Sequence, residues 1–258
     1  IRFRAAEVLL PHVALSHLDT GFVLREGALD VHSLKAGLGK GSVDGRLALK
    51  PQGKTALLTS NMKFHKVDIN SLAFLIKAAG SLEGSLDADM DISALGTSVA
   101  ELMGSLDGKA FFLMGKGRVN NGNINLLGGE LSSGLFRLVN PFEKEKQYTS
   151  INCFVGAFTV NKGLARATTL VLNTHHMVVL GEGTIDLKAE KLDLSLKPVP
   201  KEGIGASFVG RIGLSASELT RPFKLGGTLA RPRLVIDPTQ TAITLGKTIG
   251  SIALFGPA

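Results

Sequence analysis

Aromatic residues are scarce in this chain of 258 residues. It has no Trp, one Tyr and thirteen Phe, and the Phe residues lie within apolar runs. A surface that binds single-stranded nucleic acid combines stacking aromatic rings with basic residues. The net charge is +7, but the basic residues are spread along the chain, without a block of five or more like charges. The sequence therefore disfavours a nucleic-acid partner and predicts a solvated, charged protein face.

Cysteine and long hydrophobic runs are also lacking. The single cysteine, Cys153, cannot form an internal disulfide, and we expect it to be a buried, unreactive thiol because it lies in a strand-like run. No stretch of 18 apolar residues indicates a transmembrane helix. The chain begins with Ile1 rather than Met and shows no signal peptide, so we interpret it as a fragment of a longer protein.

What the sequence does contain is alternation of apolar and polar residues with a period of two. Successive side chains of a strand point to opposite faces of a sheet, so each such segment has one apolar and one solvated face. That pattern is typical of antiparallel sheets that face water on one side. The alternating segments are 42–50, 82–92, 184–190, 191–197 and 223–229.

The 31 Gly residues interrupt these strand-like segments. Glycine inside a strand indicates a bulge, a bend or a close approach of backbones, and a strongly curved sheet needs such points. Turn-forming residues separate the strands, and tight turns of this kind join antiparallel neighbours. We predict turns at 51–54, 120–123, 161–163 and 189–191.

Helical segments are few and short. The spacing of Ser98 and Glu101 is that of a capping box, which predicts a helix ending near Gly104. The other predicted helices span 69–79, 130–139 and, at the C-terminus, about 239–254. So few helices cannot cover the apolar face of so many strands. That face must meet a second sheet, curl over itself or contact a ligand.

No group of residues predicts catalysis, a metal or a cofactor. Gly181-Glu182-Gly183 opens a strand-like segment, whereas a phosphate-binding loop opens a helix. His175 and His176 are adjacent and would point to opposite faces of a strand, while a zinc site needs three or four converging ligands. The row Asp87, Asp89 and Asp91 is best interpreted as a solvated face. We therefore predict a protein that is not an enzyme and has no catalytic residues, no metal site and no cofactor.

The apolar stripe itself has two interpretations. It is either the core of a β-sandwich or the lining of an open, curved sheet. A sandwich core usually carries bulky aromatic anchors, which are few here, so we favour the open sheet.

Several short motifs occur in an order that resembles the C-terminal region of bacterial AsmA-like proteins. Each motif is weak by itself, and the ordered set is more specific. The resemblance is strongest over residues 79–238 and extends to the closing Leu254-Phe255-Gly256-Pro257-Ala258. The segments that carry it are 115–124, 151–163, 168–169, 179–187, 192–198 and 222–232.

This resemblance implies a cellular location and a lipid cargo, neither of which the residue pattern indicates by itself. AsmA-like proteins are anchored in the inner membrane by an N-terminal helix, which is missing here, and project into the periplasm. They resemble bridge-like lipid transfer proteins, whose taco-shaped sheets carry lipid tails along an apolar groove. The resemblance therefore implies a lipid-transfer module that carries phospholipid or another acyl-chain lipid between inner and outer membranes, with envelope proteins as further partners.

The prediction is thus one domain over residues 1–258. It is mainly β, an elongated, curved, groove-like antiparallel sheet with a few short helices and a C-terminal helix. The alternative is a closed β module that docks a partner protein during envelope assembly. The residues expected to line the lipid groove are Val43, Leu47, Leu49, Leu82, Leu86, Met90, Phe112, Met114, Ile185, Leu187, Leu192, Leu194, Leu196, Phe223 and Leu225.

Overall fold

A computed structural model describes residues 1–11, 13–72, 82–120, 148–175, 177–201 and 222–235. In these ranges the chain forms one antiparallel sheet of thirteen strands, in which every strand pairs with its neighbours in sequence. The strands are β1 (Arg2–Leu10), β2 (Val13–Arg25), β3 (Ala28–Leu38), β4 (Gly41–Gln52), β5 (Thr55–Asp68), β6 (Leu82–Gly96), β7 (Asp107–Asn120), β8 (Tyr148–Asn161), β9 (Leu164–Thr174), β10 (Met177–Asp186), β11 (Lys191–Pro200), β12 (Phe223–Gly227) and β13 (Pro232–Val235).

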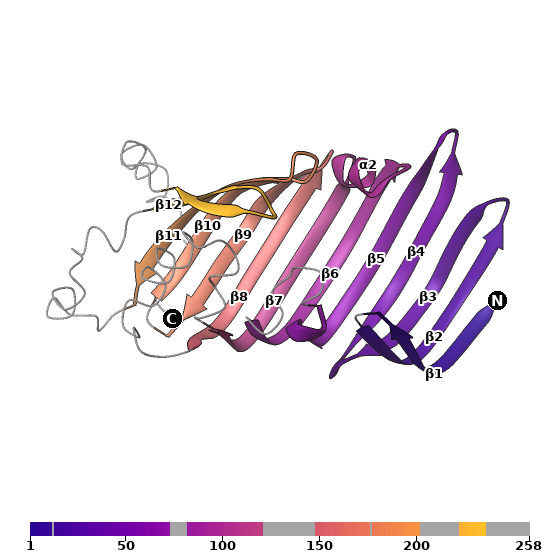
Figure 1. Cartoon of the computed structure of the whole chain (residues 1–258), viewed down its shortest axis with the longest axis horizontal. Coiled ribbons are helices and arrows are strands. Elements are labelled where there is room, and N and C mark those ends of the chain that lie inside the picture. Colours follow the sequence, from indigo (N-terminus) through magenta and orange to yellow (C-terminus); the bar gives the residue numbers. More distant parts are fainter. Residues whose placement is uncertain (12, 73–81, 121–147, 176, 202–221, 236–258) are drawn as a thin grey trace, which may run out of the picture.

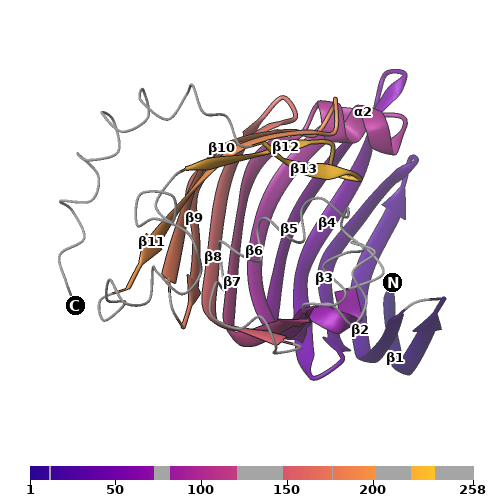
Figure 2. The same cartoon turned by 60° about the vertical axis from the view of Figure 1, so that its left-hand side comes forward.

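The sheet is open and curved (Figure 1). Its strand order runs from β1 to β13 without closing, which confirms the predicted open sheet and does not match the closed module. With strands about 4.8 Å apart, thirteen strands span roughly 58 Å. At the C-terminal end β12 and β13 lie over the neighbouring strands in both views, so the sheet curls over itself there (Figures 1 and 2).

Two short helices lie at opposite rims and on the same side of the sheet. The 3-10 helix η1 (Ile69–Leu72) follows β5, and α2 (Val99–Gly104) connects β6 to β7. We call the face that they cover the inner face and its reverse the outer face. The rim that carries α2 is the upper rim, and the rim that carries η1 is the lower rim (Figure 2).

The helix α2 at the upper rim confirms the predicted N-terminal cap, except that Glu101 bonds a different backbone amide from the one expected. Ser98 Oγ accepts a hydrogen bond from the Glu101 amide at 3.2 Å. The Glu101 carboxylate bonds the Thr97 amide at 2.7 Å rather than that of Ser98, and this hydrogen bond lowers the pKa of Glu101. The cap is therefore reciprocal but begins one residue earlier than a capping box.

The predicted turns at 51–54, 161–163 and 189–191 join successive strands as expected. Two predicted strands end early: 184–190 stops at Asp186, and 223–229 stops at Gly227. Of the helix predicted over 69–79, the structure shows η1, and the rest lies outside the described residues. The helices predicted over 130–139 and 239–254 and the turn at 121–123 also lie outside them. Within the described ranges, no helix is long and apolar enough to cross a membrane.

Candidate functional site: an apolar trough

Apolar side chains form rows along the length of the inner face, because the strand registers place apolar residues opposite one another. Residues paired across neighbouring strands point to the same face. The central row crosses six strands through consecutive pairings, and its members are Val43, Phe64, Ala88, Phe112, Gly156 and Leu170.

The central row continues past a register shift between β9 and β10. A Cβ atom placed on Gly181 would lie 2.5 Å from Leu170 Cδ2 and 2.9 Å from Leu196 Cδ2. The two leucine side chains therefore lie over the glycine, which has room for them because it carries no side chain. Gly181 pairs with Leu196, and Leu196 pairs with Phe223, so the row extends to β12.

A second row, the lower row, runs parallel to the central row and closer to η1. It crosses seven strands from β5 to β11, and each step is a direct pairing. Its members are Val67, Leu86, Met114, Phe154, Leu172, Val179 and Pro198. We call the inner face that these two rows follow the trough.

The upper rim of the trough is closed by apolar packing and by backbone hydrogen bonds. Leu102 of α2 and Leu187 pack against a buried cluster that contains Leu106 and Val160. The Gly163 amide donates to Leu106 O at 2.8 Å, and the Leu187 amide donates to Gly163 O at 2.8 Å. The rim therefore links the β6–β7, β8–β9 and β10–β11 connections into one wall.

At the lower rim, η1 packs onto the inner face. Ile69 is buried against Met114 and Ile151, and partly buried residues such as Leu86 and Phe154 surround this cluster. Both rims thus pack onto the inner face, and what lies between them is an apolar surface that no described helix covers (Figure 2).

The structure brings together fourteen of the fifteen residues predicted to line a groove, all on strands and on the inner face. Val43, Met114, Leu194 and Phe223 are buried within it. The rest are half-buried, apart from Leu49, which is 37% exposed. A bound molecule could reach only the partly exposed side chains, because a buried one such as Met114 packs against Ile69 of η1. That any of them contacts lipid stays a prediction.

Leu187 is the exception and corrects the sequence analysis. It lies one residue beyond the end of β10, in the turn before β11. Its side chain packs into the upper wall rather than on the floor. The alternation of Thr184 to Glu190 continues through this turn in the sequence, so periodicity alone could not locate the end of the strand.

Sequence reasoning missed other inner-face residues of the same rows. Phe64, Phe154, Leu170, Leu172 and Val179 all belong to the rows described above. The period-two pattern of 151–160, in which every even position from Phe154 on is apolar or Gly, was a signal that could have found one of them.

The outer face of β4–β6, with the adjoining end of β7, carries charge, as the alternation predicts. Lys63 and Asp89 are paired across β5 and β6 with 3.6 Å between Nζ and Oδ2. Arg118 Nε lies 2.6 Å from Glu83 Oε2, and this contact raises the pKa of Arg118. Asp89 and Asp91 are exposed, as expected for a solvated acidic row, whereas Asp87 is half-buried and accepts a hydrogen bond from the Lys66 amide at 3.0 Å.

The outer face is less polar on β7–β10. Leu113, Val155, Val171 and Leu180 form a continuous row there, and Leu113 is 37% exposed. Cys153 lies on β8 and is half-buried, which corrects the prediction of a buried thiol.

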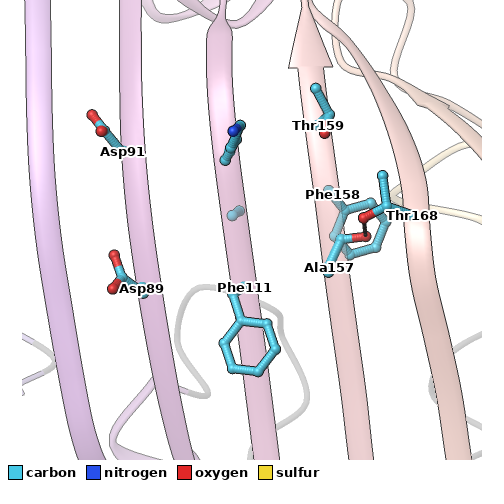
Figure 3. Close-up of a pocket in the computed structure, with 9 residues that line it drawn as sticks. Asp89, Asp91, Phe111, Ala157, Phe158, Thr159 and Thr168 are labelled. Atoms are coloured by element: carbon cyan, nitrogen blue, oxygen red, sulfur yellow. Dashed lines mark hydrogen bonds between the residues drawn. The ribbon is translucent and has the colours of Figure 1, made fainter.

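A hollow of about 390 Å³ lies on the outer face over β6–β9. In Figure 3, Asp89 and Asp91 stand on one side of it, with Phe111 between them and the threonines of β8 and β9. The Thr168 hydroxyl donates to Ala157 O at 3.1 Å. The hollow is on the reverse of the sheet and forms no part of the trough.

No candidate metal centre is present in the part of the chain that the structure describes, where no three His, Cys, Asp or Glu side chains converge. The two rows of the trough consist of apolar residues. Such a surface can hold apolar molecules by excluding water from them.

An open β-trough with an apolar floor is the class of structure that these observations define. The model of the AsmA family matches residues 1–170, which is more than half of the chain, and the chain belongs to this family. The match begins at residue 1 and overlaps the predicted region of resemblance, 79–238, as far as residue 170.

Among curated proteins the chain is similar to the AsmA family protein YhjG of Escherichia coli (strain K12). The two are 23% identical over 219 residues, which is 85% of this chain and 30% of that protein. The chain thus spans less than a third of the length of this relative. No solved structure matches it.

Proposed function

We propose that this chain is a non-enzymatic module that holds the acyl chains of lipids in the trough. In this proposal it is one section of a bridge that carries phospholipids through the periplasm between the inner and outer membranes. The proposal rests on one observation above all, the two apolar rows that run across the strands along the length of the sheet.

The direction of the rows matters for transport. Each strand contributes one apolar side chain to a row, so an acyl chain that lies along the row meets hydrocarbon at every strand spacing of about 4.8 Å. Each methylene removed from water gains about 0.8 kcal/mol. A chain that slides by one strand loses and regains the same contacts, which favours movement along the trough over release from it.

Family membership and exposure are consistent with the same proposal. A contiguous apolar surface that faces water marks a binding site or an interface. Several trough residues, among them Leu86, Met90 and Leu196, are half-exposed. An envelope location and lipid cargo are what the family resemblance implies for the chain.

The experiment places a charge in the trough and compares it with a charge on the reverse of the sheet. Leu86→Asp and Leu196→Asp introduce a carboxylate on the inner face at half-exposed positions. Leu113→Asp introduces the same group on the outer face of β7, next to the strand of Leu86, and is the control for Leu86→Asp. Ser195→Asp introduces it on the outer face of β11, the strand of Leu196, and is the control for Leu196→Asp. Native mass spectrometry and lipid extraction would be applied to each purified chain.

We expect the wild-type chain and the two outer-face variants to retain lipid, and the two inner-face variants to lose most of it. A carboxylate among acyl chains must be desolvated or protonated, at a cost of several kcal/mol. Circular dichroism would show whether each variant still forms the sheet. Equal lipid retention by folded inner-face and outer-face variants would contradict the proposal.

A further inference from the structure

A further apolar row lies beside the central row on the floor of the trough, on the side of the upper rim. It crosses six strands from β4 to β9 through consecutive pairings, and residues paired in this way point to the same face. On each strand from β4 to β8 its member is two residues from that of the central row. We call it the methionine row, and its members are Gly45, Met62, Met90, Ala110, Phe158 and Ala167.

Both rows are open to a ligand. Every member of the methionine row is half-exposed. In the central row the half-exposed side chains are Phe64, Phe112, Leu170 and Leu196. Met62 and Met90 have flexible side chains that adapt to irregular shapes, while Ala110 takes up little space. The methionine row can therefore accommodate a hydrocarbon chain that lies along it.

The rows on either side pack against the rims. Met114 of the lower row is 2% exposed, and Leu86 of the same row packs against the cluster that Met114 forms with Ile69 of η1. Beyond the methionine row, Val160 and Ala165 are each 6% exposed and belong to the buried cluster of the upper rim. What remains between the two rims is thus a floor two rows wide.

The spacing of the two rows suits two chains side by side. Side chains two residues apart on a strand are separated by about 6.8 Å, and the ring centroids of Phe112 and Phe158, one from each row, are 6.3 Å apart. Carbon atoms of neighbouring chains approach to about 3.5–4.0 Å, so a chain on each row causes no clash. The methionine row spans five strand spacings, about 24 Å, whereas one leaflet of a bilayer core is only about 15 Å thick.

We infer that the methionine row seats a second hydrocarbon chain beside the one on the central row. The inference rests on the proposed function and adds the class of ligand to it: a lipid with two chains, each of which occupies its own row. A lipid with one chain covers one row only, so a second molecule is needed to cover the other. Met62, Met90, Ala110 and Phe158 are then the residues that determine how many chains the trough takes abreast.

The experiment uses the full chain and counts bound lipids by native mass spectrometry. Phosphatidylglycerol, which has two chains, is compared at saturation with lysophosphatidylglycerol, which has the same headgroup and one such chain. Ala110→Phe places a ring in the methionine row at a half-exposed position. Ala157→Phe is the matched control, because Ala157 is also half-buried but lies on the outer face beside the hollow over β6–β9.

Hydrophobic binding is roughly proportional to the apolar area covered, so saturated wild type should hold about twice as many molecules of the one-chain lipid as of the two-chain lipid. Ala157→Phe should keep this ratio. Ala110→Phe should lose most of the two-chain lipid and bring the ratio towards one, because only the central row stays free. Met90→Gln, which keeps the size of the side chain and makes the row polar, tests the same step if Ala110→Phe does not form the sheet by circular dichroism.

Three outcomes would contradict the inference, and they differ in what they leave standing. Equal numbers of the two lipids on wild type would mean that one row holds one chain, so the methionine row is not a seat and the trough stands. An unchanged two-fold ratio in folded Ala110→Phe or Met90→Gln would place the second chain elsewhere. If wild type binds neither lipid, the proposed function fails, and the second seat fails with it.

Discussion

The two faces of the sheet share the same strands but are built differently. On the inner face, apolar residues follow one another from strand to strand without a charged residue in either row. On the outer face, charged pairs such as Lys63 and Asp89 give way to apolar side chains on β7–β10. The inner face therefore offers a continuous apolar surface, which a long apolar ligand needs. The outer face carries both charged and apolar side chains.

Burial differs between the faces even for adjacent residues. Met114 on the inner face is 2% exposed, whereas Leu113, next to it in β7 and on the outer face, is 37% exposed. Met114 packs against Ile69 of η1 and Ile151. The difference arises because η1 packs over Met114 on the inner face, whereas the described strands form a single layer with no second sheet over Leu113.

The largest expected effect on stability tests this difference between Met114 and Leu113. Met114→Ala should reduce the free energy of unfolding by about 2–5 kcal/mol, because it leaves a cavity between η1 and the floor. Leu113→Ala should reduce it by less than about 1 kcal/mol, since the side chain is already half in water. Urea unfolding of both variants measures the difference, and equal losses would show that both faces are buried alike.

A smaller effect on stability is expected at two glycines that differ in how much room surrounds them. Gly183 has φ +130° on β10, and a Cβ atom there would collide with the Asp193 carbonyl oxygen. Gly183→Ala should therefore cost about 1–3 kcal/mol, the range for a residue forced into an unfavourable backbone region. Gly115 of β7 has nothing within 4 Å of an added Cβ atom.

Gly115→Ala is accordingly the control for Gly183→Ala and should change the free energy of unfolding little. Thermal unfolding followed by circular dichroism would compare the two variants. If Gly183→Ala were as stable as Gly115→Ala, the close approach of β10 and β11 at Gly183 would not be needed for the fold.

The smallest effect concerns the outer-face charges of the edge strand β1. Arg2 and Arg4 contact Asp19 of β2 at 2.6 and 3.2 Å, and the hydrogen bond from Arg2 lowers the pKa of Asp19 to about 2. A lowered pKa in the folded state means that this pair adds stability above the unfolded pKa of about 4, and that the contribution is lost as the pH falls towards 2.

Amide exchange in β1 should therefore accelerate between about pH 4 and pH 2, relative to β8, after correction for the intrinsic exchange rate. The group is exposed, so the effect is small. Asp19→Asn should abolish the extra pH dependence of β1. An unchanged profile in that variant would show that other groups hold the edge strand.

Much of the architecture could be predicted from local sequence. The alternation in 42–50 and 82–92 determined which side chains share a face, because the pleat of a strand has a period of two. The Ser98 and Glu101 spacing located α2 for a similarly local reason. The apolar run from Ala110 to Met114 was also visible, and it indicates a strand that is apolar on both faces, which is what the outer row on β7–β10 shows.

What could not be predicted depends on contacts between distant residues. Leu187 keeps the alternating pattern but lies in a turn, where its amide donates a hydrogen bond to Gly163 O and its side chain packs into the upper wall. The hydrogen bonds that Asn152 and Lys201 donate to Asn173 join the ends of β8, β9 and β11, and no spacing in the sequence indicates them.

The sequence by itself thus determined the strands and their two faces, since these follow from side-chain periodicity and from turn-forming residues. The scarcity of bulky aromatic residues favoured the open sheet over a sandwich but did not determine it. Tertiary structure decided how the apolar residues line up into rows, which of them are buried and where the rims close. Those features depend on strand register, bulges and packing, and a shift of register by one residue would turn a strand's apolar side chains to the other face.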